Sequence, residues 1–597
     1  MEKKLQEIRR SALITPYGIG SIVPMSDEEF YLVAGLDEWH YGKTFHDYEI
    51  KEERLCRRLG VQSLRMPPDS ENAYATIPAI RFPNNFYCPK CGTVKELQPF
   101  QPIPDCTCSS KKVKMVPDRF IIVCPEGHLD DFPIGLWIHK KSNLIWDKEK
   151  CKIKRSYGST GGLASDITYR CSCGAVGHMA EAMGKGALKK AGIKCYGKRP
   201  WLGYNSEDCS ADPDELRVTL RGSTNVWFPI TRSSIYIPTQ VTNLIPDSTF
   251  ELIKCAYTSA GATADSILTA LLSKTASDLN VEVEKLVIEF RARYLQESDS
   301  GNQPDNTEEI SEDQYRQFEY ENLIRTSGSD SEEFNSKAIP SSVYSPIIHD
   351  AFDLITIVSK LRETRALVGF SRLIPQEDIK IREAKKMLYI EDPKWLPAVT
   401  VYGEGLFMNF NSDILSQWSK QDCVQKRISI MNKAFHRNSL WKDSGNLRPE
   451  FVMIHTFAHI MINQLSYECG YGTSSLRERI YCEKTDNKFM MSGVLIYTAS
   501  GDSEGTLGGL AAQGKKGILD DVVTAAIENA RWCSSDPICI ESKGQGTDSC
   551  NLAACHNCAL LPETSCELSN RLLDRALLIG TPENPELGYF NYINTYR

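Results

Sequence analysis

Cysteines at metal-binding spacing near the end of this chain constrain its fold more than any other feature. Cys555 and Cys558 form a C-x2-C turn that points two thiolates at one ion, and Cys539 and Cys566 supply a second pair across loops. Four thiolates around one tetrahedral ion are typical of structural zinc, which organises a fold and keeps no open position for catalysis. Free buried cysteines are the alternative interpretation. Two further cysteines, Cys533 and Cys550, lie nearby. If one of the four ligands is replaced, Cys533 is the preferred substitute.

A second cysteine pattern lies at Cys88-Pro-Lys-Cys91 and Cys106-Thr-Cys108. C-x2-C followed at this distance by C-x-C predicts a zinc ribbon, because each short motif turns two thiolates toward one ion. The segment Cys124-Pro-Glu-Gly-His128 follows and offers two more ligand types. Since Cys88, Cys91, Cys106 and Cys108 already complete one coordination sphere, we favour a packed turn for that segment and keep Cys124 and His128 as alternatives.

A third set of cysteines begins with Cys171-Ser-Cys173 and continues with Cys195 and Cys209, which predicts a third zinc site. A basic stretch lies inside this set, with no acidic residue among its members: Lys185, Lys189, Lys190, Lys194, Lys198 and Arg199. Such positive charge binds phosphate, and Tyr196 and Trp201 could stack on unpaired bases. The alternative is an exposed helix with ordinary solvated lysines.

The 597 residues are too many for one core, so we expect several domains. The expected parts are an N-terminal domain at 1–80, a zinc-ribbon-containing domain at 81–245, a mainly helical region at 246–395 and a C-terminal domain at 396–597. No apolar run approaches a membrane span, and the first residues lack the apolar core of a signal peptide, so we expect a cytoplasmic protein. In that compartment 21 cysteines indicate metal sites and buried thiols, not disulfides.

The net charge of −8 is concentrated in one segment, since twelve acidic residues and two arginines lie between Glu297 and Glu333. The rest of the chain is close to neutral and can therefore carry basic patches for a polyanion. Composition predicts a solvated acidic loop at 297–336, with helices at 247–297 and 350–368 on either side. The second helix would place Arg362 and Arg365 on one face. With strands expected at 29–34, 215–240 and 494–498, the fold class is α+β and multidomain.

Evidence for catalysis in the sequence is limited. Gly35 and Gly42-Lys43-Thr44 suggest a phosphate loop, but the spacing is too long and bulky side chains fill it. His455 and His459 share one face of an apolar helix at about 448–467. Thr456 replaces the glutamate of the zincin motif, so packed core histidines are favoured. The polar loop Ser500-Gly-Asp-Ser-Glu504 follows a strand, a usual place for a site, but it offers no convincing base.

The chain resembles the DrmB family, the helicase-partner subunits of the DISARM bacterial anti-phage system. The resemblance runs from end to end, and its longest motifs are Gly127-His-Leu-Asp-Asp-Phe-Pro133, Arg365-Ala-Leu-Val-Gly-Phe370, Thr498-Ala-Ser-Gly-Asp-Ser-Glu-Gly-Thr-Leu-Gly-Gly509 and the stretch 531–566. The last third is similar to the zinc-binding domain of MrfA-type DNA helicases, in which four cysteines hold zinc. That similarity implies Cys539, Cys555, Cys558 and Cys566 as ligands. Relative to the family, C-x-C at Cys106 and Cys108 replaces the more usual C-x2-C.

The resemblance implies zinc-ribbon-like four-cysteine modules, a C-terminal α/β zinc-binding domain and two or three structural Zn²⁺ ions. It also implies a non-catalytic subunit that pairs with a DISARM helicase and helps to hold foreign DNA. The methylase and the phospholipase-D-like subunit of the system are further implied partners, and no membrane is involved. The alternative function is a zinc-containing nuclease or hydrolase that uses the 500–504 loop with His455 and His459.

Overall fold

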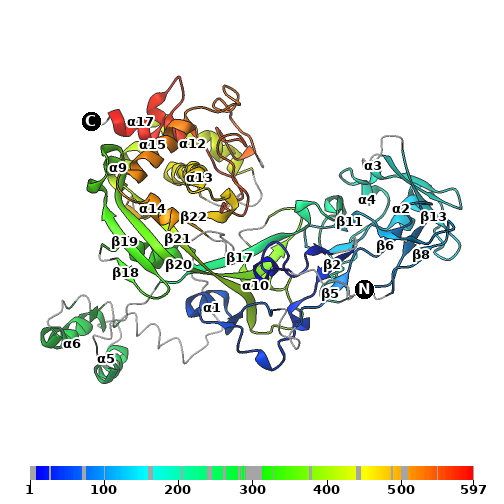
Figure 1. Ribbon diagram of the computed structural model, residues 1–597, viewed down its shortest axis with the longest axis horizontal. Coiled ribbons are helices and arrows are strands. Elements are labelled where there is room, and N and C mark those ends of the chain that lie inside the picture. Colours follow the sequence, from blue (N-terminus) through cyan, green and yellow to red (C-terminus); the bar gives the residue numbers. More distant parts are fainter. Residues whose placement is uncertain are drawn as a thin grey trace.

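We describe a computed structural model of the chain. It describes residues 8–25, 29–69, 76–99, 101–158, 166–203, 206–237, 245, 247–259, 264–279, 283, 286–287, 290, 312–326, 328–375, 379–437, 445–485, 488–498, 508–546 and 549–595. Helices and strands are mixed along the whole chain, as the α+β prediction requires. Figure 1 shows two lobes joined by long curved strands: an amino-terminal lobe (residues 85–220) and a carboxy-terminal lobe (residues 412–595).

A nine-stranded sheet connects the lobes. Its path runs β18-β19-β20-β21-β23-β22, with β17 paired to β20, and β4 paired to both β21 and β3. Each of the four expected domains contributes at least one strand to this sheet. The domain boundaries stay predictions. The strands span Glu49–Ile50 (β3), Ser63–Arg65 (β4), Phe228–Ile235 (β17), Ser329–Asp330 (β18), Asn335–Pro340 (β19), Phe352–Ser371 (β20), Trp395–Phe410 (β21), Leu476–Thr485 (β22) and Lys488–Thr498 (β23).

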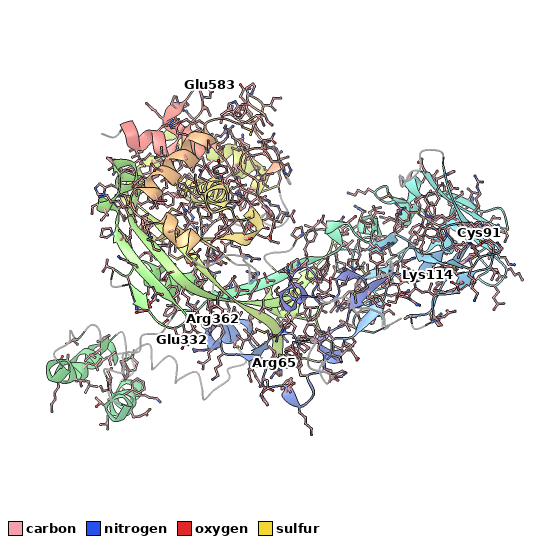
Figure 2. The ribbon with its side chains drawn as sticks, viewed as in Figure 1. Arg65, Cys91, Lys114, Glu332, Arg362 and Glu583 are labelled. Carbon is pink, nitrogen blue, oxygen red and sulfur yellow. The ribbon has the colours of Figure 1, made fainter. Side chains whose placement is uncertain are left out.

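The helix predicted at 350–368 is wrong, because this segment is the twenty-residue strand β20. It lies between β19, β17 and β21, and nearly every side chain from Leu361 onward is buried. An apolar run such as Ala366–Phe370 does not alternate with polar residues when both faces of a strand are buried, and periodicity cannot tell such a run from a helix. The two arginines therefore do not share a helix face: Arg362 pairs with Glu52 and Glu333, while Arg365 pairs with Glu363. Figure 2 shows Arg362 on the connecting strands.

The carboxy-terminal lobe is built around one buried helix, α13 (Pro449–Cys469), whose sequence is apolar on almost every face. A helix of that kind must be surrounded on all sides. It packs against β22, β23 and the helix α15 (Ile518–Ala530) within the largest core of the molecule. The remaining helices around this core are Pro346–Ala351 (α9), Ser412–Ser419 (α11), Asp422–Phe435 (α12), Gly509–Gln513 (α14), Ala576–Ile579 (α16) and Tyr589–Thr595 (α17).

The amino-terminal lobe consists of small antiparallel sheets with short helices. Its strands are Asn85–Tyr87 (β6), Val94–Glu96 (β7), Asp105–Cys106 (β8), Val113–Lys114 (β9), Val116–Pro117 (β10), Phe120–Val123 (β11), Leu129–Asp131 (β12), Ile153–Tyr157 (β13), Ile167–Cys171 (β14), Val176–His178 (β15) and Arg217–Leu220 (β16). Its helices are Ile134–Lys141 (α2), Met179–Ala182 (α3) and Ala187–Lys190 (α4). The other elements of the amino-terminal half are the small sheet of Ile22–Pro24 (β1), Phe30–Val33 (β2) and Ala79–Arg81 (β5), and two helices that pack on the large sheet, Glu53–Leu59 (α1) and Ile381–Lys385 (α10).

Part of the expected acidic loop is a docked helix, which corrects the prediction for 297–336. Residues 291–311 lie outside the described part of the chain, but α8 (Glu312–Leu323) packs against β22 and β23. Its Glu319 is fully buried and pairs with Arg479 at 2.6 Å and with Arg54 at 2.6 Å. Composition suggested solvation because it cannot show that two distant arginines meet this carboxylate. Two further helices, Asp247–Ser259 (α5) and Ala264–Leu279 (α6), share a small core of their own.

Within the described residues, no helix is both long and apolar enough to cross a membrane.

Candidate metal centres

The first predicted zinc site is assembled as expected. The turn after β6 carries Cys88 and Cys91, and strand β8 brings Cys106 and Cys108 to them. The Cys88 and Cys108 sulfurs are 3.7 Å apart, and those of Cys91 and Cys106 are 3.6 Å apart. A tetrahedral zinc with bonds of about 2.3 Å separates its sulfur ligands by about 3.8 Å, so this donor set fits the ion. Figure 2 shows Cys91 at the far end of the amino-terminal lobe.

The second four-cysteine centre lies in the carboxy-terminal lobe and contains Cys533, Cys539, Cys555 and Cys558. Its neighbouring sulfurs are 3.5 to 3.8 Å apart, which again fits tetrahedral zinc. Cys533 thus holds the place that the sequence interpretation gave to Cys566. Backbone hydrogen bonds explain the difference, because the Glu478 amide donates to the Ser565 carbonyl and fastens the Cys566 segment against β22.

The third predicted set is divided between two centres. Cys171 and Cys173 lie with His139 and Cys151, because the β13–β14 register sets Ile153 opposite Cys171. Cys195 and Cys209 lie instead with Cys124 and His128. Here the Leu129 amide donates to the Lys198 carbonyl and joins the two segments.

Both mixed centres have histidines oriented for metal binding. In one, His139 Nδ1 lies 2.6 Å from the Gly135 carbonyl, which leaves Nε2 as the lone-pair nitrogen, 3.1 Å from the Cys173 sulfur. In the other, His128 Nε2 lies 2.7 Å from Glu207 and Nδ1 lies 3.2 Å from the Cys124 sulfur. A carboxylate or carbonyl behind an imidazole is the usual support of a metal-bound histidine. The Cys124 and His128 alternative was visible in the sequence, but nothing near Cys151 marked it as a partner.

Three of these centres hold a cysteine whose pKa favours the thiolate, the form that binds metal. A hydrogen bond with Thr93 lowers the pKa of Cys91 to about 6. Hydrogen bonding with Cys124 lowers the pKa of Cys195 to about 4, and hydrogen bonding with Cys558 lowers that of Cys539 to about 5. The four centres therefore have the donor types and spacing that structural Zn²⁺ requires.

The two histidines on α13 and the displaced Cys566 meet Glu478 of β22 in a fifth group, and all four residues are buried. Both histidines are thus buried inside the lobe. The loop at 500–504, which the hydrolase alternative would use, lies outside the described residues.

The basic stretch is only partly available to a ligand. Lys189 pairs with Asp212 and Asp214, Lys198 with Asp130 and Arg199 with Glu207. Lys185, Lys190 and Lys194 are exposed, and no ion pair joins them to another residue in the described ranges. Trp201 is wrong as a base-stacking candidate: it is buried, and its indole nitrogen donates to the Met387 carbonyl. Tyr196 is exposed.

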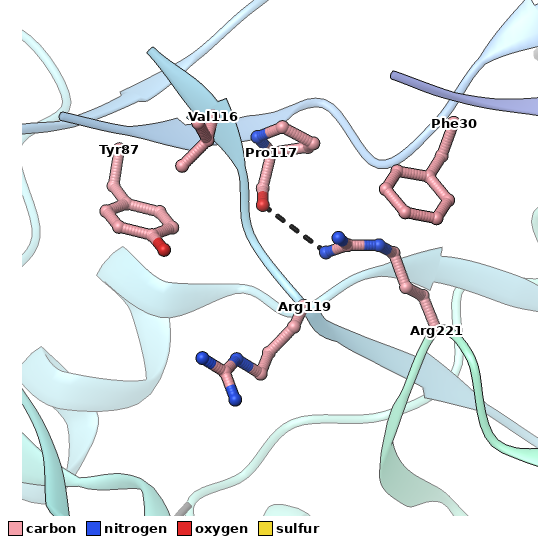
Figure 3. Close-up of a pocket in the computed structure, with 6 residues that line it drawn as sticks. All are labelled: Phe30, Tyr87, Val116, Pro117, Arg119 and Arg221. Carbon is pink, nitrogen blue, oxygen red and sulfur yellow. Dashed lines mark hydrogen bonds between the residues drawn. The ribbon is translucent and has the colours of Figure 1, made fainter. Parts of the chain in front are cut away.

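A hollow of about 340 Å³ opens between β2, β6 and β10, lined by Phe30, Tyr87, Val116, Pro117, Arg119 and Arg221. Figure 3 shows the Arg221 guanidinium against the Phe30 ring, 3.8 Å from its centroid. Arg221 also donates to the carbonyl oxygens of Pro117 and Asp118. These contacts give Arg221 a structural role in joining the strands.

Comparison with known proteins agrees with this arrangement. Residues 9–228, which contain three of the centres, match a domain of unknown function, DUF8724. Residues 457–559 match the MrfA Zn-binding domain, and this range contains all four cysteines of the second centre but not Cys566. The chain is 30% identical over 572 residues to the DISARM protein DrmB of Bacillus paralicheniformis (strain ATCC 9945a / NCIMB 11709 / CD-2), an alignment that covers 92% of this chain and 97% of that protein. The chain belongs to the DrmB family. Membership in the DrmB family makes it a protein of the DISARM antiviral defence system, and the DrmB-family chain contains centres that fit Zn²⁺.

Proposed function

We propose that this chain is a non-catalytic subunit of a DISARM complex that associates with a helicase subunit and helps to hold foreign DNA. The observation that carries the proposal is the similarity to DrmB along nearly the whole of both chains. The MrfA Zn-binding domain match supports the helicase association, since it gives this chain a zinc domain of a kind found beside a helicase motor. The methylase and phospholipase-D-like subunits of the system are further candidate partners.

The DNA contacts of this proposal are the exposed lysines of the basic stretch, Lys185, Lys190 and Lys194. They lie on or near α4, they are exposed, and no ion pair holds them to a carboxylate in the described part of the chain. Contacts of this kind are made to the backbone, so binding is independent of sequence and falls with salt. Exposed Tyr196 lies beside them and can stack on an unpaired base.

A salt series tests the proposed DNA contacts. Each phosphate contact contributes a slope of about −0.7 to −0.9 in log affinity against log salt. Replacing Lys185, Lys190 and Lys194 by Ala should therefore flatten the slope by roughly two to three units, measured by fluorescence anisotropy with labelled DNA. Lys189→Ala is the matched control, because Lys189 lies on the same short helix but is paired with Asp212 and Asp214. Equal slopes in the triple variant and the wild type would place the DNA elsewhere.

Co-purification with the helicase subunit tests the other half of the proposal. The tagged chain should retain the helicase through washes, and the triple lysine variant should retain it equally, because a solvated lysine face is a poor core for a protein interface. Failure of the wild type to retain the helicase would contradict the association without affecting the DNA result. DNA or nucleotide hydrolysis by the purified chain that is lost in Asp502→Asn would support the hydrolase alternative instead.

A further inference from the structure

We infer that His455, His459, Glu478 and Cys566 form a fifth metal centre that binds Zn²⁺ inside the carboxy-terminal lobe. The two histidines stand one helical turn apart on α13, the glutamate comes from β22, and the cysteine comes from the segment after the second four-cysteine centre. Two of these residues, His455 and Cys566, lie outside the range that matches the MrfA Zn-binding domain.

The donor atoms are spaced as ligands of one ion. His455 Nε2 lies 3.2 Å from the Cys566 sulfur and 3.1 Å from Glu478 Oε1, and His459 Nε2 lies 3.6 Å from Glu478 Oε2. All donor atoms of the group lie within 4.8 Å of one another. Tetrahedral zinc with bonds of about 2.0 Å to nitrogen or oxygen and about 2.3 Å to its one sulfur ligand sets these ligands about 3.3 to 3.5 Å apart. The observed distances are close to those values.

The polar atoms of this group lack partners that an ion would supply. The side chains of both histidines and of Glu478 are fully buried. His459 Nε2 and Glu478 Oε2 face each other across the group, yet each is a buried atom with no hydrogen-bond partner among the described residues. A buried polar atom left unsatisfied costs about 1–3 kcal/mol, so two in one apolar core are expensive unless an ion binds both.

Surrounding contacts prepare the ligands for a cation. His459 Nδ1 lies 2.7 Å from the Ala559 carbonyl, an arrangement in which Nδ1 carries the proton and Nε2 presents its lone pair to the group. The Cys566 sulfur accepts backbone hydrogen bonds from Leu568 and Asn570, which fix its position in the group. The Glu567 amide donates to Glu478 Oε1.

The donor set indicates the metal and its role. A carboxylate and a thiolate together balance the charge of a divalent cation, and two imidazoles with one thiolate are ligands that suit Zn²⁺. Four protein ligands in a buried site leave no open position, so the ion would be structural. It would join α13, β22 and the 559–570 segment. Ala559, whose carbonyl orients His459, directly follows the ligand Cys558, so the fifth centre adjoins the second four-cysteine centre.

Metal analysis of the full chain tests this centre. Cys566→Ser and His459→Gln should each contain one zinc ion fewer per chain than the wild type, measured by mass spectrometry of the metals after exhaustive dialysis. Cys482→Ser is the matched control, because Cys482 is a buried cysteine on the same strand as Glu478 but belongs to none of the five groups. This variant should retain the wild-type zinc content. Equal zinc content in the wild type, Cys566→Ser and His459→Gln would overturn the inference.

Anomalous diffraction gives a result that does not depend on whether a variant folds. Crystals of the wild-type full chain, measured above and below the zinc absorption edge, should show a zinc peak between His455 Nε2, His459 Nε2, Glu478 and the Cys566 sulfur. A peak there would support the centre even if both variants proved insoluble. Its absence would overturn the inference and show that the four side chains form a metal-free polar cluster.

Discussion

At the scale of single residues, a knuckle that binds metal depends on the residue that follows it. Gly92 follows Cys91 with a φ of +73°, and a Cβ built there would lie 1.9 Å from the Arg155 carbonyl oxygen of β13. Gly174 follows Cys173 with a φ of +99°, but a Cβ there would meet nothing within 4 Å. The two glycines therefore share a backbone requirement and differ in the space around them.

This difference predicts unequal effects of the same substitution. Gly174→Ala should cost about 1–2 kcal/mol from the left-handed backbone alone. Gly92→Ala should cost more and lower the zinc content, because β13 must move away from the first centre. Thermal unfolding with metal analysis checks both variants, and equal losses of stability would contradict the role assigned to the Gly92–Arg155 approach.

At the scale of elements, α8 depends on one carboxylate. Burial alone would raise the pKa of Glu319, but Arg479 and Arg54 outweigh it, so the pKa lies below its usual value. A lowered acid pKa means that the folded state favours the charged form. The resulting stability is present above the unfolded pKa of about 4.3 and is lost as the pH falls through the folded value.

Substituting this carboxylate tests how α8 is held. Glu319→Gln should lower the free energy of unfolding by about 3–5 kcal/mol near neutral pH, since it removes the counter-charge of the buried Arg479 and of the half-buried Arg54. Below about pH 4 its stability should change less with pH than that of the wild type. Glu321→Gln, on the exposed side of the same helix, is the control and should change stability by less than about 0.5 kcal/mol. Denaturant unfolding across pH measures both, and matching curves for the two variants would contradict this account.

The same elements show where sequence reasoning succeeds and where it fails. Cys88 and Cys91 were identified because their spacing alone brings two sulfurs together, and α13 was expected because a long apolar run occupies its residues. Glu319 was missed because its partners Arg54 and Arg479 are 265 and 160 residues away. The assignment of Cys171 and Cys195 to one site failed for the same reason: strand pairing, not spacing, decides which cysteines meet.

At the scale of the whole molecule, the lobes differ in what stabilises them. Strands of the amino-terminal lobe are two to five residues long and surround three of the candidate metal centres. The carboxy-terminal lobe has the largest apolar core of the described residues, formed around α13. Small cores usually need metal ions or other cross-links for stability, whereas large ones do not.

Metal removal should therefore unfold the amino-terminal lobe before the carboxy-terminal lobe. Titration with a zinc chelator should make residues 85–220 sensitive to protease before residues 412–465, because metal binding and folding are coupled most strongly where the core is smallest. Limited proteolysis with mass spectrometry identifies the cleaved segments, and chelator already saturated with zinc is the control. Cleavage within α13 at the lowest chelator concentrations would contradict this order.

The alternation of β22 has a consequence for folding accuracy. Glu478 points toward the two histidines of α13, while Arg479 points to the opposite face and to Glu319 of α8. The pairing Glu478↔Ile496 and Arg479↔Leu495 with β23 sets both directions. A slip of one residue would reverse the two side chains, placing a cation against the histidines and an anion against Glu319. A misaligned β22–β23 hairpin would thus lose favourable charge interactions on both faces of the sheet. The contacts of Glu478 and those of Arg479 each favour the correct register independently.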